Sequence, residues 1–400
     1  MLHKPAMLLL AIALSFWIIG CDLTETETIT KIKTVPADCT DCEGAGSPVD
    51  LNETEDPKVR EWEFLPVDGA LCRNGTDTGI GIREYDGSRK IFIYMDGGGI
   101  CLNFESCSVT PKQFQEVDFY DTVPMLYSNG IFEATDELNP LRHWNAVFIP
   151  YCTGDLHMGS NPEAHPLGVD EPQMFVGHEN MKRFVAALRD RFPKPMDQVL
   201  VIGMSAGGYG TLLAYPLFAE AFPEAHVTLL NDSGPVAAKD DALPPCYQKL
   251  LHNYFNTFPA IPEDCSDCLE DNGDGFSNVQ TYLAEKYPTG TFGLLSTTYD
   301  KAIRLAWGPG QHHCLGFLGG LLPADIYFDS LIDLRDNHLI PAGNWGTFLV
   351  YGDWHTFELN GRWLNDPERD GEGIRQWITG LVEGKPQNLG PYGTPNADGM

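Results

Sequence analysis

The chain has 400 residues, 43% of them hydrophobic and 11% aromatic, so it can bury a large core and is not globally disordered. Its 56 acidic residues outnumber its 26 basic residues, which gives a formal net charge of −30. A charge of this sign repels nucleic acid and anionic membrane surfaces, and neither is expected as a partner.

The beginning of the chain has the pattern of an export signal over residues 1–20. Lys4 lies in a short basic region, and the apolar run PAMLLLAIALSFWII leads to Gly20 and Cys21. This run is too short to be a membrane-spanning helix. The letters IIGC resemble a bacterial lipobox, whose cysteine becomes lipidated, and a plain secretory signal with an incidental cysteine is the alternative. We therefore expect an exported protein, secreted or held at a membrane only through a lipid on Cys21.

The next part of the chain, residues 21–57, is polar, acidic and nearly free of aromatic residues. This composition is typical of a solvated, flexible tether. We expect a single folded domain over residues 58–400.

Apolar strand-like runs alternate with helical patterns from Trp62 onward. Strands are expected at 90–95, 144–151, 198–203, 226–231, 291–296 and 347–352, and helices within 171–192 and near 207–222, 300–307, 323–335 and 371–383. Near-continuous apolar strands separated by helices predict an α/β fold with a mostly parallel sheet covered on both faces. The stretch 236–290 breaks this alternation with prolines and cysteines. It is interpreted as a disulfide-rich insertion that covers the edge of the sheet where an active site would lie.

Ser205 lies between glycines, in GMSAGG, where a predicted strand gives way to a helix. A sharp strand-to-helix turn pushes the serine out of the sheet, and glycines two positions before and after it remove the clashes of so tight a turn. The pattern predicts a nucleophile. The alternative is a glycine-rich turn with an incidental serine.

A serine nucleophile needs a base, and the base needs a carboxylate that orients it. In α/β-hydrolases these residues follow in the order Ser, Asp or Glu, His, each after a strand. His355 follows the last predicted strand and Asp300 follows the one before it. Asp232, at the end of the strand 226–231, is a rival acid. The rival bases are His312, His313 and His338.

The early segment YMDGGGIC closes a predicted strand with three successive glycines. Such a run lets main-chain N–H groups face inward, as an oxyanion hole requires together with the amide of the residue after the nucleophile, Ala206. A phosphate-binding loop is the competing use, but no G-K-[ST] follows.

The chain has 11 cysteines, and those that remain after Cys21 are even in number. In an exported protein they predict disulfides. Two C-x-x-C pairs, Cys39 with Cys42 and Cys265 with Cys268, are each half of a zinc-ribbon pattern, which an oxidising compartment disfavours. We expect no metal and no cofactor.

Five segments, YMDGGGICLNFESC, IPYCTGD, GMSAGGYG, NDSG and TYDKA, together resemble the pectin acetylesterase and Notum carboxylesterase family over residues 70–377. Its members are α/β-hydrolase-like enzymes that remove acyl groups from extracellular molecules. The resemblance implies a triad of Ser205, Asp300 and His355, and so favours Asp300 over Asp232. It implies oxyanion donors at Gly98, Gly99 and Ala206. It also implies the disulfides Cys72–Cys152 and Cys101–Cys107.

The chain departs from this family beside the glycine loop, where Gly99 and Ile100 replace a common tryptophan. Pectin is a polyanion, and the lysines and arginines of this acidic chain are scattered, so a neutral acetylated glycan or a small ester fits the charge better. We expect a monomeric, extracytoplasmic serine carboxylesterase that removes O-acyl groups, acetyl above all, from a saccharide or related ester. The alternatives are a long-chain lipid deacylase of the Notum kind and a catalytically silent binding protein on the same scaffold.

Overall fold

The computed structural model describes residues 58–270, 274–311, 314, 320–357 and 373–394. Over these residues, nine strands form one sheet in the order β1-β2-β4-β3-β7-β8-β9-β10-β11. The strands are β1 (Glu63–Leu71), β2 (Asp77–Arg83), β3 (Lys90–Met95), β4 (Asn145–Ile149), β7 (Gln198–Met204), β8 (His226–Asp232), β9 (Thr291–Thr297), β10 (Trp345–Val350) and β11 (Asn388–Tyr392). All of the described residues belong to one compact unit, Thr54–Met400.

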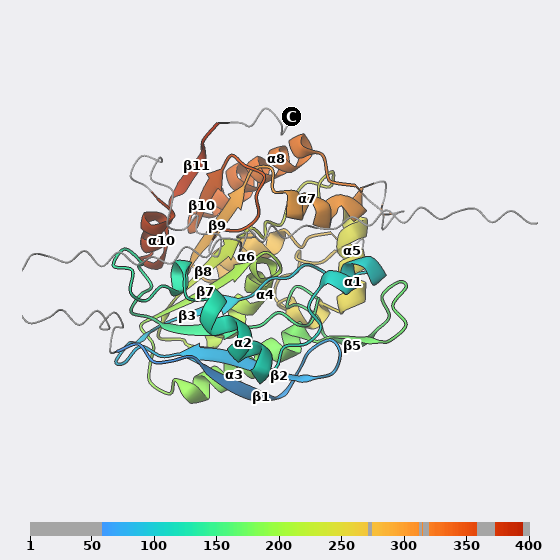
Figure 1. Cartoon of the computed structure of the whole chain (residues 1–400). Coiled ribbons are helices and arrows are strands. Elements are labelled where there is room, and N and C mark those ends of the chain that lie inside the picture. The colour runs from blue at the N-terminus through green and yellow to red at the C-terminus, as the bar shows by residue number, and fades with distance from the viewer. Residues whose placement is uncertain (1–57, 271–273, 312–313, 315–319, 358–372, 395–400) are drawn as a thin grey trace, which may run out of the picture. The chain divides into compact units, whose positions relative to one another are not determined.

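The sheet is parallel from β4 to β11 and antiparallel only at one end, where β1 pairs with β2 and β2 with β4. A parallel pair needs a crossover connection, usually a helix, which explains the alternation of strands and helices in the sequence. Figure 1 shows the sheet with its blue N-terminal end at β1 and its red C-terminal end at β11. The carboxyl ends of β3, β7, β8, β9 and β10 therefore meet along one edge of the sheet.

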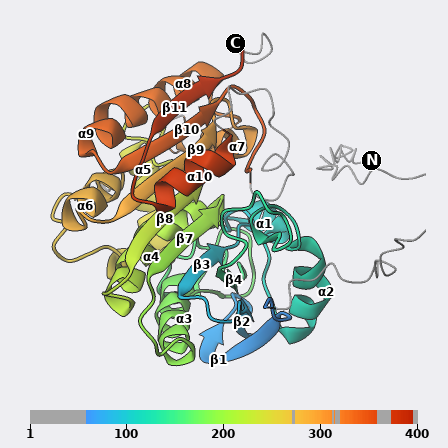
Figure 2. The ribbon, with the colours of Figure 1, turned by 90° about the vertical axis from the view of Figure 1, so that its left-hand side faces the viewer.

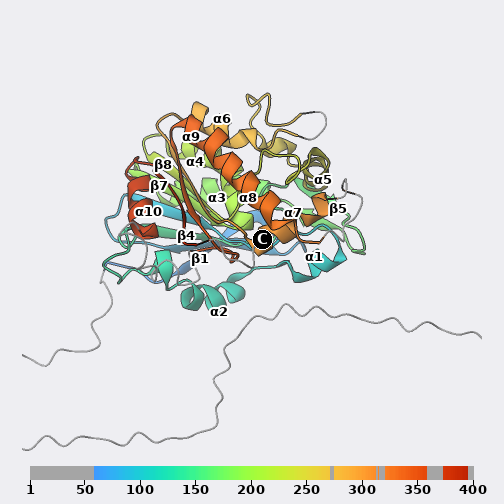
Figure 3. The same cartoon turned by 90° about the horizontal axis from the view of Figure 1, so that it is seen from above.

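Helices cover both faces of the sheet (Figures 2 and 3). On one face lie α3 (Gly177–Arg191), α4 (Ala206–Ala221), α6 (Asn278–Lys286) and α8 (Ala324–Asp333), and on the other lie α2 (Glu116–Leu126) and α10 (Ile374–Val382). A π-helical turn, Leu334–Leu339, joins α8 to the short α9 (Ile340–Ala342).

The strand β3 shows how the sequence builds these two layers. Its letters KIFIYM are apolar at every position after the first, and successive side chains point to opposite faces. Ile91 and Ile93 join the core under α3 and α4, whereas Phe92 and Tyr94 join the core under α2 and α10. The α/β-hydrolase-like fold class predicted from the sequence is confirmed.

The segment 236–290 is more regular than an insertion. It connects the parallel strands β8 and β9 and contains α5 (Pro245–Phe255) and α6. Val279 and Leu283 of α6 are buried in the core, and Trp345 of β10 donates an indole hydrogen bond to the carbonyl of Gln280. Part of this segment is thus an ordinary crossover helix rather than a cover over the active edge.

Short elements complete the edge of the sheet around the site. They are α1 (Phe104–Val109), β5 (Asn161–Ala164), β6 (Gln173–Phe175) and α7 (Lys301–Trp307). None of the helices in the described part of the chain is long and apolar enough to cross a membrane.

Candidate active site

Ser205 lies on a strained turn between β7 and α4. Its backbone has φ 55° and ψ −118°, a conformation that costs free energy for any residue except glycine. A Cβ on Gly203 would lie 2.3 Å from the carbonyl oxygen of Gly207, and a Cβ on Gly207 would lie 2.0 Å from the carbonyl oxygen of Met95. Both glycines of the G-x-S-x-G pattern are therefore required by close backbone contacts.

The residue after the serine, Ala206, is the first residue of α4. Its amide belongs to the N–H groups at a helix N-terminus, which have no partner within the helix and favour negative charge. This is the position that an oxyanion donor needs.

The glycine loop after β3 packs directly on the serine. A Cβ on Gly97 would lie 2.6 Å from the carbonyl oxygen of Met204 and 3.0 Å from the Cβ of Ser205, so only glycine allows this approach. Gly99 has φ +85°, which L-residues rarely adopt. Tyr151 donates a hydrogen bond from its hydroxyl to the carbonyl oxygen of Gly99, 2.8 Å away. Sequence reasoning selected Gly98 and Gly99 but missed Gly97, although the run DGGG contains it.

Asp300 and His355 are brought together from the loops after β9 and β10. Nδ1 of His355 lies 2.7 Å from Oδ2 of Asp300, and the Asp300 side chain is fully buried. A carboxylate can only accept, so the hydrogen of this bond lies on Nδ1, and in the neutral imidazole Nε2 is then the basic nitrogen. The other carboxylate oxygen, Oδ1, accepts from the amides of Ala302 and Ile303 and caps α7. Asp300 is thus a helix cap and the partner of His355 at the same time.

Asp232, the rival acid, joins the turn of the nucleophile to the loop of the histidine. Its carbonyl oxygen accepts from the amide of Ser205 at 2.8 Å, and its Oδ2 accepts from the amide of Phe357 at 2.7 Å. Its Oδ1 accepts from the hydroxyl of Ser233, whose Oγ in turn accepts from the amide of Thr356 at 3.2 Å. The carboxylate of Asp232 therefore contacts the residues after His355, and it is Asp300 that contacts the imidazole.

His355, Asp232 and Asp96 are among the titratable groups at this edge whose pKa values are shifted. Burial lowers the pKa of His355, but the hydrogen bond and negative charge of Asp300, together with the charge of Asp232, outweigh it and leave the pKa raised. Burial raises the pKa of Asp232 to about 7, and the Phe357 amide and the Ser233 hydroxyl oppose part of this effect. Burial also raises the pKa of Asp96, beside the glycine loop, to about 7, against the opposing hydrogen bond from Tyr127.

The other candidate bases do not join this arrangement in the described residues. His338 lies on the π-helical turn after α8, with its Nε2 3.8 Å from Asp333. His312 and His313 lie outside the described residues, as do Cys21 and the pair Cys39 and Cys42.

Four disulfides occur in the described part of the chain. Two are the pairs that the resemblance implied, Cys72–Cys152 and Cys101–Cys107. The other two, Cys246–Cys314 and Cys265–Cys268, had no predicted partners. Cys265 and Cys268, one of the two C-x-x-C pairs of the sequence, are thus joined to each other.

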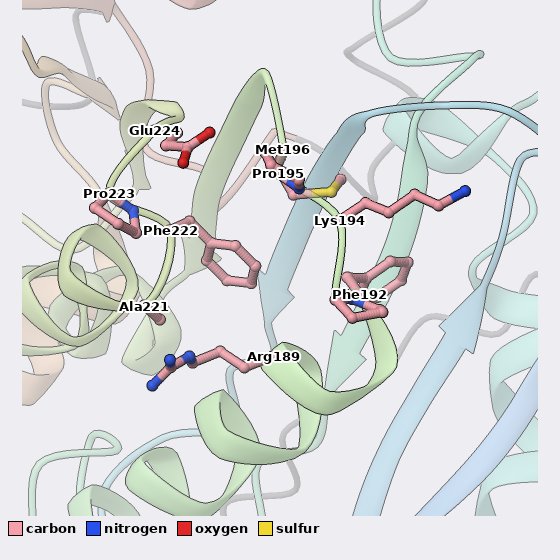
Figure 4. Close-up of a pocket in the computed structure, with 10 residues that line it drawn as sticks. Arg189, Phe192, Lys194, Pro195, Met196, Ala221, Phe222, Pro223 and Glu224 are labelled. Atoms are coloured by element: carbon pink, nitrogen blue, oxygen red, sulfur yellow. The ribbon is translucent and has the colours of Figure 1, made fainter.

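A small depression of about 210 Å³ lies at the opposite edge of the sheet (Figure 4). Its lining includes Arg189, Phe192 and Lys194, and these residues lie at the end of α3 and before the start of β7. It therefore opens at the amino ends of the strands, away from Ser205.

A mostly parallel sheet with a serine on a strand-to-helix elbow, a glycine loop beside it and an aspartate–histidine pair after later strands defines an α/β-hydrolase-like protein. The comparison with protein families agrees with this class. The family described as Pectinacetylesterase matches residues 60–307. The chain belongs to the pectinacetylesterase family, and the resemblance noted from its sequence is confirmed.

Among the relatives of this chain are proteins that carry the Notum name. The chain is 31% identical over 181 residues to palmitoleoyl-protein carboxylesterase notum1 of Xenopus laevis, a match that covers 41% of this chain and 34% of that protein. It is 30% identical over 110 residues to inactive palmitoleoyl-protein carboxylesterase notum1b of Danio rerio, covering 26% of this chain and 78% of that one. The chain thus spans about a third of the length of the first of these relatives.

The crystal structure of the Wnt deacylase Notum from Drosophila has a similar fold. The TM-score is 0.58 at 18% sequence identity, and the match covers 82% of this chain and 96% of the other. At this identity the likeness supports the fold alone.

Proposed function

We propose that this protein is an extracytoplasmic serine carboxylesterase that removes O-acyl groups, acetyl above all, from a saccharide through an acyl-enzyme. The observation that carries the proposal is the 2.7 Å hydrogen bond between His355 and the buried Asp300, on a loop that Asp232 ties to the turn of Ser205. Membership of the pectinacetylesterase family supports the reaction class.

In this mechanism Nε2 of His355 takes the proton of the Ser205 hydroxyl while Oγ attacks the ester carbonyl carbon. The carbonyl oxygen becomes negatively charged and faces the amides of Gly98, Gly99 and Ala206. The tetrahedral intermediate then expels the alcohol oxygen, which takes the proton from His355, and the acyl group stays on Ser205. Water repeats the sequence at the acyl-enzyme and releases the carboxylic acid.

The location and the assembly state form part of the same proposal. The four disulfides of the described residues fit an oxidising compartment. We infer that the protein is exported through residues 1–20, held through a lipid on Cys21 and a tether over 21–57, and active as a monomeric domain over 58–400. No nucleic acid and no cofactor takes part.

Hydrolysis of p-nitrophenyl acetate by the wild type and by Ser205→Ala tests the proposed function. We expect the variant to lose activity and keep its fold, because the change removes one hydroxyl from a turn whose shape depends on Gly203 and Gly207. Thermal unfolding of both proteins checks the fold. Wild-type turnover by a contaminant-free Ser205→Ala preparation would falsify the assignment of the nucleophile.

A second candidate function is long-chain deacylation, because the relatives named above are called palmitoleoyl-protein carboxylesterases. The reaction and the residues are the same, so only the preferred acyl length separates the two. A third candidate function is binding without catalysis, because one of the relatives is called an inactive carboxylesterase. The comparison with Ser205→Ala tests it, since a catalytically silent protein and its Ser205→Ala variant would hydrolyse the ester at the same rate.

A further inference from the structure

A cleft of about 720 Å³ lies beside the loop that follows α1. One wall is formed by residues 104–112, from α1 to the loop that follows it, and the other by residues 168–173, while Arg73 and Asn74 also line it. Pro111 of the first wall lies against Gly98, where a Cβ would be 3.0 Å from the proline Cδ. The neighbouring Gly97 packs on Ser205, so Pro111 and the glycine loop lie between the cleft and the serine.

The cleft is held open by fixed contacts. Arg73 is only 4% exposed, and its guanidinium donates to the carbonyl oxygens of Pro111 and Thr110 on one wall and to Oε1 of Gln173 on the other. Among the described residues no carboxylate lies within ion-pair distance of this guanidinium, so it ties the two walls through neutral acceptors. The disulfide Cys101–Cys107 further constrains the first wall. A ligand therefore meets a preorganised surface, which lowers the entropic cost of binding.

The groups around the cleft suit a neutral sugar. Phe104 is 61% exposed and lines the cleft, and an aromatic ring is an apolar partner for the C–H face of a pyranose. Asn74, Lys112, Asp170 and Glu171 also line the cleft and supply hydrogen-bond donors and acceptors for hydroxyl groups. Two carboxylates, Asp170 and Glu171, are matched by two cationic side chains, Arg73 and Lys112, so the lining has no net charge that would favour an anionic sugar. Polar groups on both walls interrupt the apolar surface that a long acyl chain needs.

We propose that this cleft is a saccharide subsite, which holds a pyranose ring of a neutral O-acylated glycan beside the acyl group under attack. The proposal rests on the esterase function proposed above and names the class of its substrate. In this proposal residues 104–112 and 168–173 select the substrate by its alcohol part, the sugar, rather than by its acyl part.

The test compares Phe104→Ala with a matched control, Phe258→Ala. Phe258 is 47% exposed but lies on a short helical turn, Phe258–Ala260, and does not line the cleft. For each variant, kcat and KM are measured with an acetylated xylo-oligosaccharide and with p-nitrophenyl acetate. We expect Phe104→Ala to lower the ratio of the two kcat/KM values about tenfold, through KM of the oligosaccharide, and Phe258→Ala to leave this ratio unchanged. An unchanged ratio in Phe104→Ala, or an equal loss in both variants, overturns the subsite.

Binding to the inactive Ser205→Ala protein separates this proposal from the function itself. Calorimetry with the same oligosaccharide requires no turnover, and we expect Kd to rise about tenfold when Phe104→Ala is added to Ser205→Ala. Tighter binding of an acetylated oligogalacturonide than of the neutral oligosaccharide refutes the choice of a neutral glycan. Absence of oligosaccharide binding to Ser205→Ala refutes the subsite, whereas retained hydrolysis by Ser205→Ala refutes only the proposed nucleophile.

Discussion

Two buried carboxylates at the same edge of the sheet, Asp300 and Asp232, allow a matched test of the proposed mechanism. Both are changed to asparagine, which has the same shape and no charge. In Asp300→Asn the amide oxygen still caps α7 through the amides of Ala302 and Ile303, and the NH₂ group then faces Nδ1 of His355. A donor at that place stabilises the wrong tautomer of the imidazole, and we expect kcat to fall about 10⁴-fold, or about 5.4 kcal/mol.

Asp232→Asn should cost much less. The amide oxygen can accept from the amide of Phe357, and the NH₂ group can donate to Oγ of Ser233 in place of the hydroxyl hydrogen bond that is lost. One hydrogen bond is worth about 1 kcal/mol, so kcat/KM should fall by less than about tenfold. The change also removes a negative charge that raises the pKa of His355, so the acid limb of the pH profile should move to lower pH.

The assay is p-nitrophenyl acetate hydrolysis by the two variants and the wild type between pH 5 and 9, with thermal unfolding as the control for folding. His355 acts as a base only when it is neutral, so wild-type kcat/KM should decrease as the pH is lowered. The midpoint of this decrease should lie above the ordinary histidine pKa of about 6.5. A larger loss in Asp232→Asn than in Asp300→Asn, with both variants folded, would move the catalytic acid to Asp232 and refute the reasoning.

Two further predictions concern stability. The pKa of Asp96 is about 7 in the folded protein, whereas its ordinary value is 3.8, so the folded state binds a proton more tightly and loses stability as the pH rises between these values. The difference in Tm between Asp96→Asn and the wild type should therefore shift in favour of the variant from about pH 4 to about pH 7. A difference in Tm that stays constant over this range would contradict the prediction. The disulfide Cys72–Cys152 joins residues 80 positions apart, and Cys101–Cys107 joins residues 6 positions apart. Chain entropy predicts that replacing both cysteines of a pair by serine lowers the free energy of unfolding by about 4.5 kcal/mol for the first pair and about 2.2 kcal/mol for the second, measured by denaturant unfolding. Equal losses for the two pairs, or free thiols at Cys101 and Cys107 in active protein, would contradict this prediction.

The central strands were predictable from the sequence because both of their faces are buried. The strand β3 was expected at 90–95 and occupies Lys90–Met95, and the others from β7 to β10 differ by a few residues at their ends. For β4 the expected range 144–151 shortens to Asn145–Ile149, since Pro150 has no N–H to donate to a neighbouring strand.

The two edges of the sheet were not predicted. The strand β1, EFLPVDGAL, contains Pro66, its partner β2 contains two glycines, and β11 at the far edge contains Gly390 and Pro391. An edge strand tolerates proline because one side of it has no partner, but proline and glycine remove the local signal by which strands are recognised. The edges are thus set by pairing with the sheet rather than by local sequence.

The local sequence could not decide whether Asp232 or Asp300 orients the catalytic histidine. Asp232 and Asp300 both follow apolar strands, and both positions suit a turn or a cap. They differ only in what lies across the edge: the amide of Phe357 reaches Asp232, and the imidazole of His355 reaches Asp300. These are contacts between residues 125 and 55 positions apart in the chain, so no window of sequence contains them.

The acyl side of the site leads to a prediction about substrate length. Of the two residues that replace the common tryptophan, Ile100 is partly buried against the core and Gly99 offers no side chain. Phe255, an aromatic residue of the segment 236–290, is fully buried in an edge-to-face contact with Phe175, 4.9 Å between ring centroids. Neither Ile100 nor Phe255 therefore supplies an apolar wall for a long chain.

Each methylene enclosed by an apolar pocket contributes about 0.8 kcal/mol, so a long-chain enzyme raises kcat/KM roughly fourfold for every CH₂ added. Without such walls we expect kcat/KM for p-nitrophenyl esters to peak at acyl chains of about two to four carbons and then to decline. Ile100→Trp is the informative variant, because it restores an aromatic residue where the family commonly has a tryptophan, whereas any side chain at Gly99 would be strained by its φ of +85°. A wild-type maximum at about eight carbons or more would instead mean that other residues enclose the chain, and would favour the long-chain deacylase over the acetylesterase.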